Sequence, residues 1–199
     1  MITILKTGQS KILRIFYEDK KARFHLRDIA RRTKLYPNSA TRFLNQLEKE
    51  GILTSQKDGN LKKYGIKKSG KLSNIFASFD IERLNKLPSA RKRAINYFLD
   101  KLQKKPIIVL LFGSTAKESF RKDSDIDLLL IVNNKIDVDK AKDYVDAQIG
   151  IKINCFQITY NEFLTEIKLK EDKVIQSALN AGYPIFNQML FYGVYLNGD

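Results

Sequence analysis

The sequence has few cysteines and lacks long apolar runs and a signal-peptide pattern, and these features exclude several classes of protein. Its 199 residues include a single cysteine, Cys155, so no disulfide can form within the chain. No stretch approaches the roughly 20 apolar residues of a membrane-spanning helix, and the N-terminus lacks a signal-peptide cleavage pattern. We therefore expect a cytoplasmic protein. The only histidine, His25, is assigned no role.

Acidic residues are scarce in the N-terminal third. Residues 1–70 contain 17 Lys and Arg against 6 Asp and Glu, whereas residues 71–199 contain 19 against 16. Most of the net charge of +14 therefore belongs to the first 70 residues. This asymmetry suggests a polyanionic partner, although a lysine-rich solvated surface explains the charge alone equally well.

Apolar spacing predicts three helices and a hairpin within residues 10–68. The helices are expected over residues 10–17, 26–32 and 37–50. The third has Pro37 in its first turn and Gly51 just after its end, which suits both residues. From Leu53 the pattern predicts a strand, a turn over residues 57–60 and a second strand to about Ile66.

This arrangement, with the run from Leu35 to Leu53, resembles a winged helix-turn-helix domain, in which the third helix enters the DNA major groove. The resemblance implies double-stranded DNA as a partner, with protein–protein contact as the alternative. Candidates for base or phosphate contact on the third helix are Asn38, Ser39, Thr41, Arg42 and Asn45. Candidates for phosphate contact from the second helix and the wing are Arg31, Arg32, Lys34, Lys57, Lys62 and Lys63.

A second pattern occupies residues 107–132. A β-branched apolar run ends at Phe112 and is followed by Gly113-Ser114, which predicts a buried strand and a tight turn. Asp125 and Asp127 then open another apolar run. Residues two apart share a face of a strand, so the two carboxylates are expected to lie together, where a hard divalent cation would relieve their repulsion.

Gly113, Ser114, Ser124, Asp125 and Asp127 together resemble the pattern of nucleotidyltransferases related to DNA polymerase beta, above all the minimal nucleotidyltransferases of prokaryotes. The resemblance implies Asp125 and Asp127 as catalytic and metal-binding residues for Mg²⁺ or Mn²⁺. It also implies a nucleoside triphosphate as substrate, bound by Gly113, Ser114, Lys117 and Ser124. Glu118 stands where these proteins usually have glycine.

One departure from the family concerns the third carboxylate, which usually lies on the following strand. The predicted strand over residues 151–158 has no acid, and Asn154 occupies the expected position. An enzyme is favoured, one that transfers a nucleoside monophosphate to an unknown acceptor and is tethered to DNA. The alternatives are a DNA-binding transcriptional regulator whose transferase domain is weak or only senses a nucleotide, and antitoxin-like action on a protein partner.

The expected fold class is α+β, in three parts. Residues 1–70 form the winged helix-turn-helix, residues 71–105 a helical linker packed on the second domain, and residues 106–199 the nucleotidyltransferase-like domain. That domain should be a mixed sheet of about four strands with helices on one side. A short edge strand is expected around Pro184. The apolar tail, residues 189–195, should pack on the body or make a homodimer contact.

Overall fold

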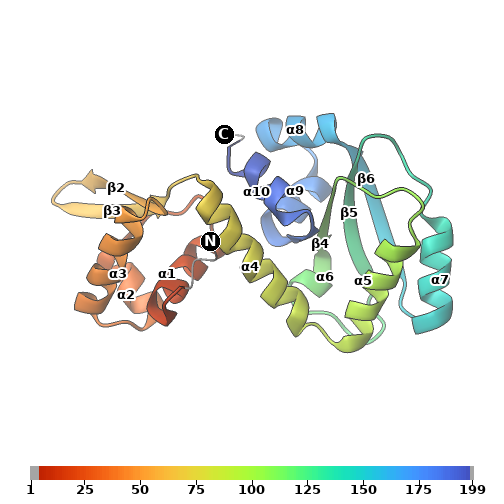
Figure 1. The fold of residues 1–199 in the computed structure, drawn as a ribbon, viewed down its shortest axis with the longest axis horizontal. Coiled ribbons are helices and arrows are strands. Elements are labelled where there is room, and N and C mark those ends of the chain that lie inside the picture. Colours follow the sequence, from red (N-terminus) through yellow and green to blue (C-terminus); the bar gives the residue numbers. More distant parts are fainter. Residues whose placement is uncertain (1–4, 198–199) are drawn as a thin grey trace. The chain divides into compact units, whose positions relative to one another are not determined.

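The computed structural model describes residues 5–197 and divides into two compact units (Figure 1). The first unit ends at Phe76 and the second begins at Ala77, so the boundary falls within helix α4 (Gly70–Lys86). The division into residues 1–70, 71–105 and 106–199 stays a prediction. None of the helices in the described range is long and apolar enough to cross a membrane.

The first unit combines three helices with a three-stranded antiparallel sheet. Its sheet order is β1-β3-β2, and β2 and β3 form the wing. This is the topology of a winged helix-turn-helix, as the sequence predicted, with the very short β1 as an addition. The elements are α1 (Thr7–Glu18), β1 (Phe24–His25), α2 (Leu26–Thr33), α3 (Pro37–Lys49), β2 (Leu53–Asp58) and β3 (Leu61–Ile66).

Packing between α1 and α3 fixes the position of the third helix. Leu44 and Leu47 of α3 are fully buried, as are Ile12 and Phe16 of α1. Gly8 lies directly under the Phe43 ring, since a Cβ atom added to Gly8 would stand 2.1 Å from a ring carbon. The absence of a side chain at residue 8 therefore lets the two helices approach closely.

The second unit is built on a four-stranded mixed sheet of order β6-β5-β4-β7. Strands β5 and β6 are parallel, joined through α7, and the other pairs are antiparallel. The elements that follow α4 are α5 (Ser89–Lys101), β4 (Ile108–Phe112), α6 (Gly113–Ala116), β5 (Ile126–Val132), α7 (Asp139–Ile149), β6 (Ile153–Thr159), α8 (Tyr160–Leu169), α9 (Lys173–Ala181), β7 (Tyr183–Phe186) and α10 (Gln188–Tyr195).

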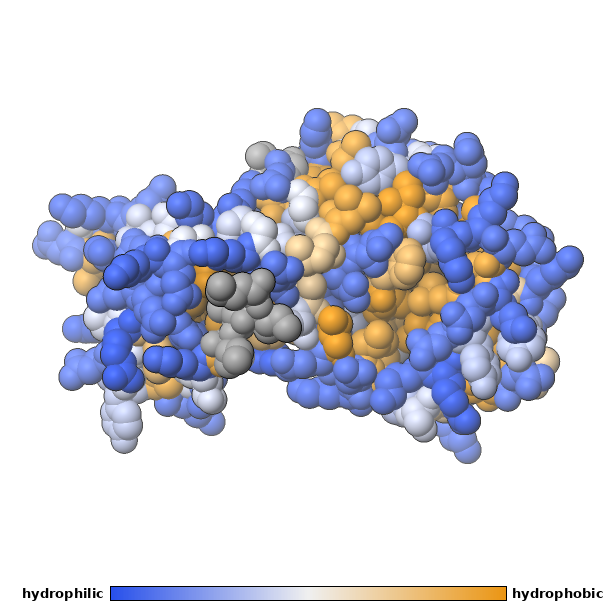
Figure 2. Space-filling view, in the orientation of Figure 1, coloured by the Kyte–Doolittle hydropathy of each residue, from blue (hydrophilic) through white to orange (hydrophobic). Residues whose placement is uncertain are grey.

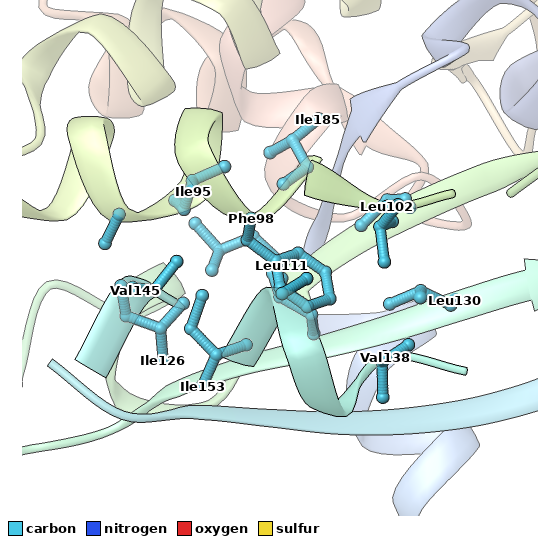
Figure 3. Packing of buried hydrophobic residues seen from close by; sticks show 14 of the residues in the cluster. Ile95, Phe98, Leu102, Leu111, Ile126, Leu130, Val138, Val145, Ile153 and Ile185 are labelled. Atoms are coloured by element: carbon cyan, nitrogen blue, oxygen red, sulfur yellow. The ribbon is translucent and has the colours of Figure 1, made fainter. Parts of the chain in front are cut away.

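Helices cover both faces of this sheet, whereas the sequence placed them on one side. Side chains of α5 and α7, such as Phe98 and Val145, pack with Leu111 and Leu130 on one face (Figure 3). On the other face α8, α9 and α10 contact the central strands. The physical reason is that β4 is buried at every position and β5 at every position except Asp127. A strand that is apolar on both faces of the sheet needs a layer of helices packed against each face.

The last strand and helix complete the second face. Strand β7 is an edge strand and contains Pro184, which agrees with the prediction made from proline. Phe191 and Tyr192 of α10 are buried, and Phe191 contacts Phe163 of α8. The apolar tail thus packs on the body of this unit.

The surfaces of the two units differ in character. Figure 2 shows hydrophilic side chains over the wing strands β2 and β3, and apolar surface gathered on the second unit. The polar cover of the wing agrees with the concentration of Lys and Arg in residues 1–70.

Candidate functional site

The site begins where strand β4 ends and the chain turns into the short helix α6. Gly113 adopts a φ of +68°, the left-handed region that favours glycine. A Cβ atom on this residue would stand 2.0 Å from Oδ2 of Asp127. Gly113 therefore meets two requirements at once, the backbone turn and the close approach of the Asp127 carboxylate.

Three polar side chains converge beside Gly113 at this edge of the sheet. The Nδ2 amide nitrogen of Asn154 donates hydrogen bonds to Oδ2 of Asp125 at 3.1 Å and to Oδ1 of Asp127 at 3.2 Å. The register pairs Asp127 with Asn154 across parallel strands β5 and β6. The predicted placement of Asn154 beside the two aspartates is thus confirmed.

The electrostatics of this cluster follow from its donors and acceptors. Ionised carboxylates only accept hydrogen bonds, so the amide must turn its NH₂ group towards them. The NH₂ group partly offsets the repulsion between the two carboxylates, where a cation would offset it more fully. Within residues 5–197 no group of three or more His, Cys, Asp or Glu side chains gathers around a metal-sized space. The acidic part of the donor set is therefore the Asp125–Asp127 pair.

The other residues predicted to bind nucleotide lie along the turn and the loop that follows. Ser114 is half-buried in α6, and Lys117 is exposed immediately after it. The Ser124 hydroxyl accepts a hydrogen bond of 2.8 Å from the backbone N–H of Arg121. In this conformation Ser124 holds the loop, and its hydroxyl hydrogen remains available to a ligand.

Two arginines that sequence reasoning missed contact this region from the preceding helices. Arg83 of α4 donates a 2.7 Å hydrogen bond to the carbonyl of Ala116 and stacks on the Tyr183 ring. Arg91 of α5 is buried and donates to several groups between α6 and β5. Burial lowers the pKa of Arg91, and the Asp125 carboxylate acts in the opposite direction. The sequence signal for Arg91 is its place on the buried stripe of Ala94 and Phe98 at helical spacing.

The lone cysteine lies on the opposite face of β6 from Asn154. Burial raises the pKa of the Cys155 thiol to about 12. The thiol is therefore protonated at neutral pH, in agreement with the expectation of a structural cysteine.

On the first unit, the candidate DNA-contacting residues of α3 form a partly exposed face. Asn38, Arg42 and Asn45 are exposed, while Ser39 and Thr41 are half-buried. The Thr41 hydroxyl donates to the Pro37 carbonyl within the helix. The guanidinium of Arg42 lies 5.2 Å from the centre of the neighbouring Phe43 ring.

The basic residues around the wing are not equivalent. Lys62 is exposed, whereas Lys63 forms a 2.7 Å ion pair with Asp58 and holds the pKa of that carboxyl below its usual range. Arg32 is exposed and lies over the Phe24 ring at 4.7 Å. His25 contacts Asp58 through Nε2 at 3.2 Å. Lys62 and Arg32 are therefore better placed than Lys63 to meet a phosphate.

Comparison with solved structures finds winged-helix regulators. A homodimeric winged helix-turn-helix DNA-binding domain from Mycobacterium bovis, a possible ArsR-family transcriptional regulator, is 18% identical, with 42% of this chain and 73% of that chain covered and a TM-score of 0.34. MepR, a transcription regulator of a Staphylococcus aureus multidrug efflux pump, is 18% identical over 49% of this chain and 77% of its own, with a TM-score of 0.35. Lactococcus lactis ZitR in complex with DNA is 19% identical over 50% and 74%, with a TM-score of 0.32.

These TM-scores are too low to carry an argument, so the winged-helix assignment rests on the topology of the first unit. A comparison with curated proteins found no match. The second unit gives a firmer result, because the family described as "Polymerase beta, Nucleotidyltransferase" matches residues 92–189. These residues, which include Gly113, Asp125 and Asp127, form a domain of the polymerase beta nucleotidyltransferase type.

Proposed function

We propose that the second unit transfers a nucleoside monophosphate from a nucleoside triphosphate to an acceptor. The observation that carries this proposal is the convergence of Asp125, Asp127 and Asn154 beside Gly113. Two acids held together next to a strand-to-helix turn favour a substrate that brings both phosphate and a cation. The match of residues 92–189 to the nucleotidyltransferase family supports the same reaction class.

The two carboxylates fit Mg²⁺ or Mn²⁺. Magnesium in phosphoryl-transfer sites is commonly held by one or two carboxylates, with waters and substrate phosphate oxygens in the remaining positions. Asp125 and Asp127 would hold the ion, and Asn154 could turn its Oδ1 towards it as a neutral ligand. When bound, the ion would neutralise phosphate charge and favour departure of pyrophosphate.

The remaining residues would bind and orient the triphosphate. The backbone at Gly113 and Ser114 would approach the phosphates, and exposed Lys117 would supply positive charge. Ser124 could donate its hydroxyl hydrogen to a phosphate oxygen while its oxygen still accepts from the Arg121 backbone. An acceptor nucleophile would then form a bond to the α-phosphorus as the bond to pyrophosphate breaks, with its proton passing to water.

Calorimetry with magnesium and each nucleoside triphosphate tests this proposal. Wild-type protein should bind at least one triphosphate only when magnesium is present, and binding should raise the melting temperature by mass action. Asp125→Ala combined with Asp127→Ala should abolish the rise while the variant stays folded. Incubation with labelled triphosphates and cell extract would then reveal the acceptor. A wild-type protein without magnesium-dependent nucleotide binding would contradict the proposed activity.

A second candidate is a regulator whose transferase unit is weak or only senses a nucleotide, and Asn154 favours it. An amide is a neutral and weaker magnesium ligand than a carboxylate. Such a protein would bind a triphosphate without consuming it. Nucleotide binding without release of pyrophosphate, in the presence of extract, would distinguish this function from transfer. Antitoxin-like action on a protein partner is the remaining alternative, and co-purification of that partner would test it.

For the first unit we propose double-stranded DNA as the partner. The support is its topology, the excess of Lys and Arg in residues 1–70, and the exposure of Arg42 and Asn45 on α3. Duplex affinity should fall steeply with salt, because each phosphate contact contributes about 0.9 to the log–log slope. Binding that does not change with salt would contradict this role. We also propose that the chain can form a homodimer, which light scattering with and without DNA would test.

A further inference from the structure

The loop between α6 and β5, residues 117–125 (the site loop), is organised around one buried side chain. The Arg91 guanidinium donates through Nη2 to the carbonyls of Arg121 at 3.0 Å and Ser124 at 2.8 Å. Through Nη1 it donates to the Thr115 hydroxyl at 2.8 Å and reaches the Asp125 carbonyl at 3.5 Å. The guanidinium also lies 4.1 Å from the centre of the Phe120 ring.

These contacts need the shape of arginine as well as its charge. Arg91 is only 3% exposed, and it donates hydrogen bonds to the Thr115 hydroxyl and to the backbone carbonyls of Arg121 and Ser124. A guanidinium presents five N–H donors in a fixed planar fork, whereas a lysine ammonium presents three donors at one point. The Arg91 guanidinium can therefore bond to both α6 and the site loop and hold them against α5.

The two aspartates receive different support from the backbone. Asp127 lies within β5 and is paired on both sides, with Phe112 of β4 and with Asn154 of β6. Asp125 precedes the strand, and its carbonyl lies 3.5 Å from both Arg91 Nη1 and the Thr115 hydroxyl. The sheet thus holds Asp127, and the site loop sets the position of Asp125.

We propose that Arg91 is a positioning residue that places the Asp125 carboxylate beside Asp127 and Asn154. As a statement about metal binding, this inference rests on the proposed function, since both aspartates would hold the ion. The hydrogen bonds described for Arg91 go to the Thr115 hydroxyl and to backbone carbonyls of the site loop. Arg91 therefore acts on Asp125 through the backbone of the site loop.

The first test measures the site loop in the metal-free protein. Arg91→Gln keeps much of the side-chain length but removes the fork, and Arg91→Lys keeps only the charge. In both variants the amides of Glu118, Ser119 and Ser124, which are bonded within α6 and the loop, should exchange with deuterium at least about tenfold faster. Thr115→Val, which removes one partner of Arg91, should act in the same direction with a smaller effect.

A matched control separates this role from general destabilisation. Ile167→Ala removes a buried side chain of α8 and should lower the melting temperature without accelerating exchange in the site loop. In NMR spectra the side-chain NH₂ signal of Asn154 should shift in Arg91→Gln in the same direction as in Asp125→Asn, because both changes disturb the bond to Asp125. Unchanged loop exchange and an unchanged Asn154 signal in Arg91→Gln would overturn the inference, whether or not the protein binds metal.

The second test uses Mn²⁺ as the probe in a double-mutant cycle followed by calorimetry. In the wild-type background Asp125→Asn should weaken Mn²⁺ binding about tenfold. In the Arg91→Gln background the same substitution should weaken Mn²⁺ binding less than about twofold, because the Asp125 carboxylate is already out of position. Asp127→Asn should remain costly in both backgrounds. Equal effects of Asp125→Asn in the two backgrounds would overturn the inference. Absence of Mn²⁺ binding by the wild type would refute the proposed metal site, while the exchange and NMR results would still decide the role of Arg91.

Discussion

Replacing Asn154 by aspartate changes the charge of the site with almost no change in shape. The Asn154 Nδ2 group lies 3.1 Å and 3.2 Å from oxygens of Asp125 and Asp127. In Asn154→Asp, an acceptor oxygen replaces this donor, so two hydrogen bonds become two contacts between like charges. The site is solvent-exposed at Asn154, so the effective dielectric constant lies close to that of water. Each new like-charge pair then costs about 1 kcal/mol.

Both hydrogen bonds are exposed to solvent, so we use the typical net value, and their loss adds roughly 1 kcal/mol each. Without metal, the free energy of unfolding at low ionic strength should therefore fall by about 3–4 kcal/mol, which corresponds to roughly 10 °C in melting temperature. With magnesium the sign reverses, because the third carboxylate attracts the ion that the NH₂ group repels. We expect magnesium to bind at least about tenfold more tightly, or about 1.4 kcal/mol.

Thermal melts in chelator and in magnesium, together with calorimetry, measure both effects. Asn154→Ala is the control, since it removes the hydrogen bonds without adding charge and should lose about half as much stability. High salt should recover part of the loss in Asn154→Asp and little in Asn154→Ala, because salt screens only the repulsion. If Asn154→Asp has wild-type stability in chelator and wild-type magnesium affinity, the reasoning is refuted.

Four further predictions follow from particular residues. Gly113→Ala should weaken magnesium-dependent nucleotide binding by calorimetry, since its Cβ atom would displace the Asp127 carboxylate; Gly70→Ala, with nothing within 4 Å, is its control. Gly8→Ala should lower the free energy of unfolding by about 1–2 kcal/mol in denaturant melts, because overpacking against Phe43 outweighs the gain in helix propensity. In gel shifts, Arg42→Ala should reduce sequence preference and Lys62→Ala should weaken all duplexes alike, and the opposite pattern would contradict the proposed α3 interface. The raised pKa of Cys155 predicts a free energy of unfolding that falls as the pH rises from about 9 towards 12, because the folded state holds the thiol proton more tightly, and a Cys155→Ala variant should lose this component.

Local patterns predicted the elements and their facing side chains. The period of two along a strand placed Asp125 and Asp127 on one face, and the predicted strand through Asn154 placed its amide beside them, as the hydrogen bonds confirm. The positions of Pro37 and Pro184 likewise predicted the start of α3 and an edge strand. Each of these inferences depends only on neighbours in the sequence.

Contacts between distant parts of the chain were not predictable in this way. Arg91 donates hydrogen bonds to carbonyls about 30 residues later in the sequence. The spacing of apolar residues along a helix does not show which loop a buried arginine will contact. Glu118 gives an intermediate case. It stands where the resemblance to minimal nucleotidyltransferases predicts glycine, and it adopts a left-handed φ of +56°. The sequence therefore shows the substitution, but only the structure shows that the backbone keeps the glycine-like conformation.

The position of β4 in the sheet has a consequence for the order of events during synthesis. Strand β4 carries the chain into Gly113, and it lies between β5 and β7. Its pairing with β7 joins Val109 to Phe186, so the partner leaves the ribosome many residues later. The winged helix, whose elements all lie before residue 77, can fold while that strand is still being made. Until β7 arrives, β4 presents an unpaired apolar edge, which is the kind of surface that nascent chains must shield from aggregation.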